Sequence, residues 1–276
     1  MCIRDSFYQN RSGIEVESQY ITSGDADALA HASGHSSDVA RITTDWNDLQ
    51  SNGGTQDVTG GWYDAGDHLK FTLTNAYSAA LLGWGLLNYG DGVDKAGQRT
   101  MYENNLQFVL DYLVGCDQGD NIVYMIGEGS FDHVWWGAAE MYMNKYELMK
   151  GETERPYYTC EDSCIQADMA AALCTGYLNF KDSKPEKAKE YLEHAIDLFD
   201  RADKLRAIGD DPEEQPYYKI TTFYDDLFYA ANWLYMATGD QKYLDLCKTD
   251  YIPNLGKEEQ SSDCLLYTSP SPRDTR

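Results

Sequence analysis

Apolar residues recur with the spacing of an α-helix along most of the chain from about residue 75 onward. The segment 185–207 carries them at i, i+3, i+4 and i+7, which places them on one face of a helix. These positions are Ala188, Tyr191, Leu192, Ala195, Ile196, Phe199 and Ala202. Two more stripes of this form are Tyr102, Leu106, Val109, Leu110, Leu113, and Leu227, Ala230, Ala231, Leu234, Tyr235. The pattern predicts an all-α chain.

Boundary signals divide this pattern into six to seven helices. Ser183 and Glu186 have the spacing of a capping box, with Pro185 in the first turn. Gly239 predicts a helix end and Asp240 a new start. We expect helices over about 75–89, 98–115, 136–149, 165–180, 185–207, 226–238 and 241–248.

The loops between these helices alternate in character. Three are rich in aromatic and acidic residues, namely "TGGWYDAGDH" (59–68), "GEGSFDHVWW" (127–136) and "QPYYKITTFYDD" (215–226). The others, such as "FKDSKPEK", are short and polar. Stacked helix hairpins place alternate loops at opposite ends, so one end is expected to carry the chemistry. Residues 7–263 contain no linker and are predicted to form one domain.

The two ends of the chain have a different origin from the rest. The DNA that can encode "MCIRDS" (1–6) has a reverse complement that encodes "CLLYTS" (264–269). Both strings, with the following "PSPRD", resemble translated sequencing adapter. We therefore interpret residues 1–6 and 264–276 as adapter-derived and residues 7–263 as a fragment of a longer parent protein.

Composition limits the partners. The chain has 276 residues, 42% of them hydrophobic, and a formal net charge of −24. This negative charge disfavours nucleic acid and anionic membrane surfaces as partners. No apolar run reaches the roughly 20 residues that cross a bilayer, so no membrane partner is expected.

Five cysteines remain once the two in the terminal segments are excluded: Cys116, Cys160, Cys164, Cys174 and Cys247. Cys160 and Cys164 are four apart and lack the second pair typical of a zinc site. A disulfide or free buried thiols are therefore favoured over a metal, and the pairing stays open.

Two carboxylates stand three apart in "GGWYDAGDHLKF", at Asp64 and Asp67. This spacing suits a shared water, with one carboxylate as general base and the other orienting the water. The neighbouring rings of Trp62 and Tyr63 offer flat apolar faces on which sugars stack. On spacing alone, a capped turn with solvated aspartates or a cation site is the favoured explanation.

The same segment resembles the signature of glycoside hydrolase family 9, the inverting cellulases. Three further blocks resemble that family in its order: "FYQNRSG" at 7–13, "FDHVWWGAAE" at 131–140 and "YYKITTFYDDLFYAANWLYMATGD" at 217–240. The resemblance implies part of an (α/α)6 toroid of helix hairpins. It also implies a secreted endo-β-1,4-glucanase, predicted to be a monomer, that hydrolyses cellulose or a related β-glucan with inversion.

The resemblance assigns roles to particular residues. Asp67 would be the general base and Asp64 would help to hold the attacking water. Substrate contacts would come from His133, Tyr217, Trp136, Trp62 and Tyr63. Catalysis would require no cofactor.

Departures from the family pattern limit these expectations. Ile220, Thr221 and Thr222 replace an aromatic residue and Ser-Gly. Some members bind calcium at the position of Asp225 and Asp226, so a structural calcium ion there stays open. The family's general acid is a glutamic acid far downstream, so the fragment alone is expected to be inactive. The alternative is a non-catalytic glucan-binding or scaffold protein with the same cleft.

Overall fold

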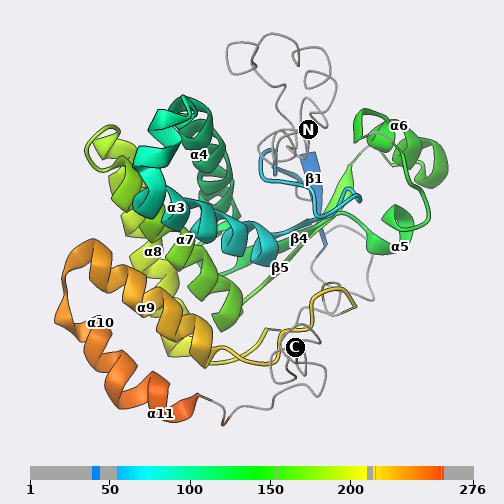
Figure 1. The fold of residues 1–276 in the computed structure, drawn as a ribbon. Coiled ribbons are helices and arrows are strands. Elements are labelled where there is room, and N and C mark those ends of the chain that lie inside the picture. Colours follow the sequence, from blue (N-terminus) through cyan, green and yellow to red (C-terminus); the bar gives the residue numbers. More distant parts are fainter. Residues whose placement is uncertain are drawn as a thin grey trace, which may run out of the picture.

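The structure, a computed structural model, describes residues 39–43, 55–137, 139–152, 154–209, 214, 216–255 and 257. The block at 7–13 and both segments interpreted as adapter-derived lie outside the described residues. Helices dominate what is described (Figure 1). The helices are α3 (Thr72–Lys95), α4 (Arg99–Cys116), α5 (Gly129–Asp132), α6 (Ala139–Lys150), α7 (Ser163–Phe180), α8 (Pro185–Leu205), α9 (Tyr224–Thr238), α10 (Gln241–Leu246), the π-helical turn η2 (Cys247–Tyr251) and α11 (Ile252–Asn254).

Each helix expected from the apolar pattern is present. Helix α3 runs beyond the predicted end at Tyr89, but that residue has non-helical angles (φ −123°, ψ 18°) and marks a kink. Gly239 ends α9 in a left-handed conformation (φ 71°), and the Asp240 carboxylate accepts the N–H of Lys242 at the start of α10. The stop and restart signals are therefore confirmed.

The predicted capping box at α8 is wrong. Helix α8 begins with Pro185 at its first position, so the N-cap is Lys184 and no side chain caps the helix. Ser183 lies one residue too early for its hydroxyl to serve as the cap. Pro185 needs no partner for a backbone N–H, which lowers the need for a cap at this end.

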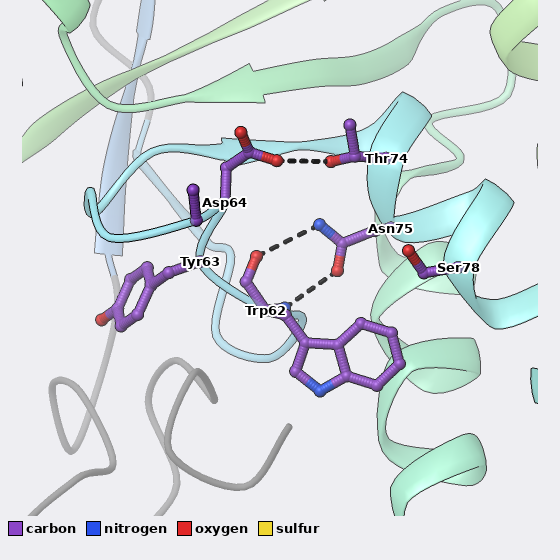
Figure 2. Close-up of a pocket in the computed structure, with 7 residues that line it drawn as sticks. Trp62, Tyr63, Asp64, Thr74, Asn75 and Ser78 are labelled. Carbon is purple, nitrogen blue, oxygen red and sulfur yellow. Dashed lines mark hydrogen bonds between the residues drawn. The ribbon is translucent and has the colours of Figure 1, made fainter. Parts of the chain in front are cut away.

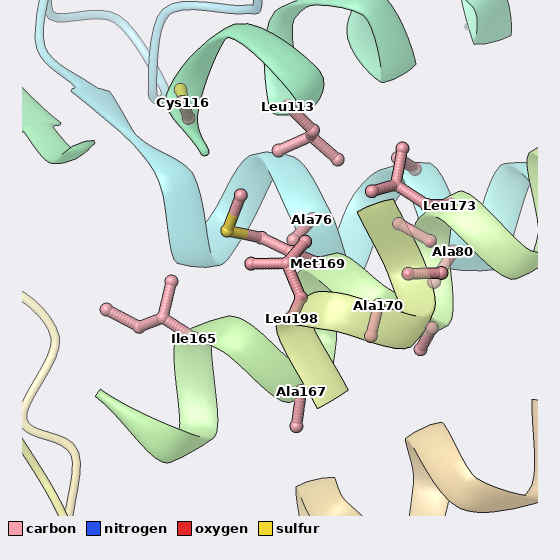
Figure 3. Packing of buried hydrophobic residues seen from close by; sticks show 14 of the residues in the cluster. Ala76, Ala80, Leu113, Cys116, Ile165, Ala167, Met169, Ala170, Leu173 and Leu198 are labelled. Atoms are coloured by element: carbon pink, nitrogen blue, oxygen red, sulfur yellow. The ribbon is translucent and has the colours of Figure 1, made fainter. Parts of the chain in front are cut away.

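Helix α7 lies at the centre of the helical core. It packs against α3, α8 and α9, and most of its residues are buried, including a run of alanines that allows close approach of its neighbours. Figure 3 shows Met169 and Leu173 of α7 among Ala76 and Ala80 of α3 and Leu113 of α4. The apolar stripes seen in the sequence supply this core.

A five-stranded sheet is the part of the fold that the helical pattern did not predict. Its order is β2-β1-β5-β4-β3, with β1 and β5 parallel and the other neighbours antiparallel. In Figure 1 the strands lie between the large group of helices and the pair α5 and α6. The strands are β1 (Val39–Thr43), β2 (Thr55–Asp57), β3 (Lys70–Phe71), β4 (Ile122–Ile126) and β5 (Arg155–Cys160).

The five cysteines outside the terminal segments are all buried as free thiols. The structure thus agrees with the second of the two favoured alternatives. Among the described residues, no helix has the combination of length and apolarity that a bilayer-spanning helix needs.

Candidate active site

Contacts with Tyr112 and Asn75 fix the backbone of the loop that carries the two aspartates, upstream of β3. Gly61 has a left-handed φ of 71°, and a Cβ there would lie 2.7 Å from the ring of Tyr112. Asn75, in the first turn of α3, accepts the backbone N–H of Trp62 at 2.8 Å and donates to its carbonyl at 3.2 Å (Figure 2). The backbone just before Asp64 is therefore tied to α3.

The turn between the aspartates is tight and strained. The backbone N–H of Asp64 donates to the carbonyl of Leu69 at 2.8 Å and closes the loop. Ala65 has a φ of +29°, a conformation that costs a non-glycine residue free energy and that occurs often at functional sites. The turn holds the two carboxylates close enough for the charge of Asp64 to raise the pKa of Asp67.

Asp67 is 8% exposed. Burial raises its pKa from 3.8 to about 7, and the nearby charges of Asp132 and Asp64 add to this effect. Its Oδ1 accepts no hydrogen bond from the described part of the chain. A carboxylate with a pKa near 7 and an unbonded oxygen is suited to take a proton from water near neutral pH.

Asp64 differs from Asp67 because both of its oxygens are bonded. The hydroxyl of Thr74 donates to Oδ1 at 3.0 Å, which Figure 2 shows, and the phenol of Tyr218 donates to Oδ2. The sequence reasoning did not select Tyr218. Its only signal was its position next to Tyr217 in an aromatic loop.

Strand pairing brings Asp132 and His133 beside the loop that carries Asp64 and Asp67. Strands β3 and β4 are antiparallel with Lys70 opposite Ile126, so the residues before β3 lie beside those after β4. There, Asp132 accepts the backbone N–H of His68 at 3.1 and 3.2 Å. The following residue, His133, places Nε2 3.7 Å from Oδ2 of Asp67.

Three of the residues predicted to contact substrate lie together around this point. The ring of His133 lies 5.0 Å from that of Tyr217 and 5.5 Å from that of Trp136. Trp136 is 60% exposed and lies over Gly66 in the aspartate turn. This exposed indole therefore presents a flat apolar face beside a buried carboxylate.

The rings of Trp62 and Tyr63 do not form the open stacking faces that the sequence suggested. Each is only 5% exposed, and Figure 2 shows their rings pointing in opposite directions. They are among the residues that line a small pocket with Asp64 and Thr74. Their position makes them part of its wall, because the aromatic faces are covered by the fold.

A larger hollow of about 450 Å³ adjoins Asp64. It is lined by Asp64, Leu73, Thr74, Tyr77, Asp168 and Tyr218, with Ser78. The pocket extends from the aspartate loop to the carboxylate of Asp168 on α7. The three loops rich in aromatic and acidic residues meet at the two aspartates, through Tyr218 on Asp64 and His133 beside Asp67, as the loop pattern predicted.

Asp225 and Asp226, predicted as a possible calcium pair, have different surroundings in the structure. Asp226 faces inward, where it lies with Cys164 and Asp168 so that their possible ligand atoms are within 4.8 Å of one another, whereas Asp225 is exposed. Burial and the neighbouring carboxylate raise the pKa of Asp226. Two carboxylates suit a hard cation such as calcium, but the Cys164 thiol does not.

A second group that could hold a cation comprises Asp67, Asp132 and His133, whose possible ligand atoms also lie within 4.8 Å of one another. Asp132 is already engaged by the N–H of His68. Its carboxylate therefore has a structural role in joining the two loops.

Comparison with known proteins places these features in a family context. A family model described as "Glycosyl hydrolase family 9" matches residues 4–270. Endoglucanase B of Cellulomonas fimi is 38% identical over 211 residues, covering 75% of this chain and 20% of the relative. Endoglucanase 10 of Arabidopsis thaliana is 37% identical over 205 residues, covering 73% and 37%.

Solved structures give the same result. The crystal structure of endoglucanase CelQ from Clostridium thermocellum, complexed with cellotriose, matches with a TM-score of 0.69 and 36% identity. That match covers 94% of this chain and 37% of the other. The endoglucanase of the termite Nasutitermes takasagoensis matches with a TM-score of 0.70 and 28% identity over 91% of this chain and 54% of its own.

Proposed function

Because the chain belongs to glycosyl hydrolase family 9, we propose that its parent protein is an endo-β-1,4-glucanase acting on cellulose or a related β-glucan. The fold of the family agrees with the predicted class, a mainly helical part of an (α/α)6 barrel. The chain spans 20% and 37% of the length of the two relatives described above. The activity, the substrate, a monomeric state and secretion are therefore proposed for the whole protein.

The proposal rests on the different environments of the two aspartates. Asp67 is buried with an unbonded oxygen and a raised pKa, whereas Asp64 is held by two hydroxyl groups. Asp67 is therefore the residue able to accept a proton. Asp64 stays in place and orients the water whose proton is removed.

The reaction follows from these roles. As Asp67 takes a proton from water, the water oxygen bonds to the anomeric carbon and the glycosidic C–O bond on the opposite face breaks. The leaving oxygen needs a proton from a second carboxylic acid, about 6.5 to 9.5 Å from the base in inverting enzymes. The family resemblance implies a glutamic acid downstream of the matched blocks. Residues 1–276 alone are accordingly proposed to be inactive.

Substrate binding is proposed for the exposed side of the same loops. Trp136 would stack on a sugar ring beside the cleavage point, and His133 and Tyr217 would contact its hydroxyl groups. CelQ was solved with cellotriose and with cellotetraose. The same short β-glucans are therefore suitable probes for this chain.

The test compares the parent-length protein with its Asp67→Asn variant on carboxymethylcellulose, mixed-linkage glucan and xyloglucan. The wild type is expected to hydrolyse at least one of them, and the variant to lose at least about 1,000-fold in kcat because no other group takes the proton. NMR of the product formed first should show inverted anomeric configuration. Full activity in the variant would rule out the proposed base. Binding of cellotetraose by a wild type that hydrolyses none of the glucans would favour the non-catalytic alternative.

We propose that a structural calcium ion would be held by a pair of carboxylates different from the predicted one. Asp168 and Asp226 would supply carboxylate oxygens, in place of the predicted pair of Asp225 and Asp226. Calcium should then raise the unfolding temperature of the chain relative to EDTA. Asp226→Asn should abolish that rise, whereas Asp225→Asn should leave it unchanged.

A further inference from the structure

We propose that Arg155 is a positioning residue for the base, which holds the backbone next to Asp67 and places a buried positive charge beside it. Its effect on catalysis rests on the proposed function, whereas its effect on the titration of Asp67 can be measured without any activity. Arg155 lies outside the sequence blocks that carry the family resemblance.

The guanidinium of Arg155 is buried where β5 begins. Its Nη1 donates to the carbonyl of His68, the residue that follows Asp67. The backbone N–H of His68 donates to the carboxylate of Asp132 at the end of α5. The backbone of His68 is therefore held on both sides, by a cation from β5 and by an anion from α5. These two bonds fix the direction in which the chain leaves Asp67.

The surroundings of Arg155 suit a cation held away from water. The rings of Tyr63 and Tyr142 lie 5.9 and 5.6 Å from its Cζ, distances at which the face of an aromatic ring attracts a cation. Gly127, directly after β4, leaves room for the guanidinium, because a Cβ there would lie 3.3 Å from Nη1. The aspartate loop, α6 and the end of β4 therefore enclose the side chain together.

The buried cation offsets the charge of two buried carboxylates, those of Asp67 and Asp132. Burial raises the pKa of Asp67 most, the charges of Asp132 and Asp64 add to the rise, and the charge of Arg155 opposes it. Burial likewise raises the pKa of Asp132, and Arg155 opposes that rise too.

Removal of this cation would leave the two carboxylates with less compensation for their mutual repulsion. The titratable groups that face Asp67 are Asp64, Asp132, His133, Arg155 and Tyr218. Loss of the guanidinium removes a group that favours the ionised form of the base. Asp67 would then hold its proton to higher pH.

The first experiment follows the titration of Asp67 by NMR in the full chain labelled with ¹³C-aspartate, with Asp67→Asn used for assignment. In Arg155→Met, which keeps an unbranched side chain but removes its charge, the midpoint should rise by about one pH unit. Arg155→Lys, which keeps the charge, should show less than about half of that rise. Arg99→Met, which removes a cation paired with Asp94, should leave the midpoint unchanged. A wild-type midpoint in folded Arg155→Met would overturn the proposal.

A second pair of variants decides the question if Arg155→Met alone does not fold. Asp132→Asn removes one buried negative charge but keeps an oxygen that can accept the N–H of His68, so the Asp67 midpoint should fall. Adding Arg155→Met to Asp132→Asn removes one charge of each sign, so the double variant should fold. Its Asp67 midpoint should lie about one pH unit above that of Asp132→Asn. Equal midpoints in these two proteins would refute the role of Arg155.

The catalytic measurement is the pH profile of kcat/KM in the parent-length protein, which reports the pKa of the base in the free enzyme. Arg155→Met should move the acid limb to higher pH by the shift seen in the NMR titration, and Arg155→Lys should largely restore it. A residue that only supports the fold would lower the amount of active protein and leave the acid limb in place, so an unmoved limb would refute the positioning role. A wild type without glucanase activity would instead refute the proposed function, and the NMR midpoints would still decide the proposal.

Discussion

At the scale of single residues, Asp67 shows how burial prepares a carboxylate for chemistry at the expense of stability. Burial raises its pKa from the ordinary 3.8 of an aspartate to about 7, so the folded state binds more protons than the unfolded chain between these pH values. The free energy of unfolding therefore falls as pH rises through that interval. Asp67→Asn does not ionise, so it should exceed the wild type at pH 8 by up to about 4 kcal/mol.

The measurement is urea unfolding of both proteins at several pH values between 4 and 8. The advantage of the variant should shrink as pH falls and nearly vanish near pH 4, where Asp67 is protonated in the folded state and close to half protonated in the unfolded chain. Asp120→Asn, which removes an exposed carboxylate, controls for the change in net charge. A constant difference at all pH values would show that the burial of Asp67 does not govern the effect.

The sequence identified most residues of the site but not their surroundings. Asp64, Asp67 and His133 were recognised because they lie in conspicuous motifs, and the structure brings them together. Tyr218 was missed because only the path of its loop decides which of two consecutive tyrosines faces Asp64. The burial of Trp62 is likewise set by α3, through Asn75, and has no local sequence signal.

At the scale of elements, local signals determined what could be predicted. Helices α4, α8 and α9 were predicted to within two residues at each end, because each keeps one apolar face and starts or stops at a local feature. Strand β4, "IVYMI", is buried at every position and shows no alternation. The pairing of β4 with β3 and β5 joins distant segments, so no local pattern revealed the sheet.

The start of α5 offers a test of how elements position the site. A Cβ on Gly129 would lie 2.0 Å from the hydroxyl of Tyr217, so Gly129→Ala should push that side chain away from His133. We expect at least a tenfold loss of affinity for cellotetraose by calorimetry, with the fold retained. Gly115→Ala in α4 is the matched control, because nothing lies within 4 Å of the added atom. It should bind normally and gain up to about 1 kcal/mol of stability.

At the scale of the whole molecule, one apolar surface stands out on a chain of net charge −24. Tyr77, Leu81 and Trp84 stand at i, i+4 and i+7 on one face of α3 and are 41–54% exposed. The ring of Trp84 meets that of Trp233 on α9, 6.0 Å away. Trp233 is itself buried, and α9 carries a separate exposed apolar residue, Met236.

Such a surface should bind the dye ANS even though the protein is folded, because exposed apolar area rather than loose packing is the cause. The double variant Leu81→Lys with Met236→Lys, at positions 41% and 58% exposed, should lower ANS fluorescence at least twofold. Its unfolding free energy should change by less than about 1 kcal/mol, since neither side chain is in the core.

Leu86→Lys, at a position only 2% exposed, should instead lose more than about 3 kcal/mol of unfolding free energy and increase ANS binding, because it buries an unpaired charge. If the double variant bound ANS as strongly as the wild type, the dye would be reporting loosened packing in the core, and the near-ultraviolet circular dichroism of the wild type should then be weak.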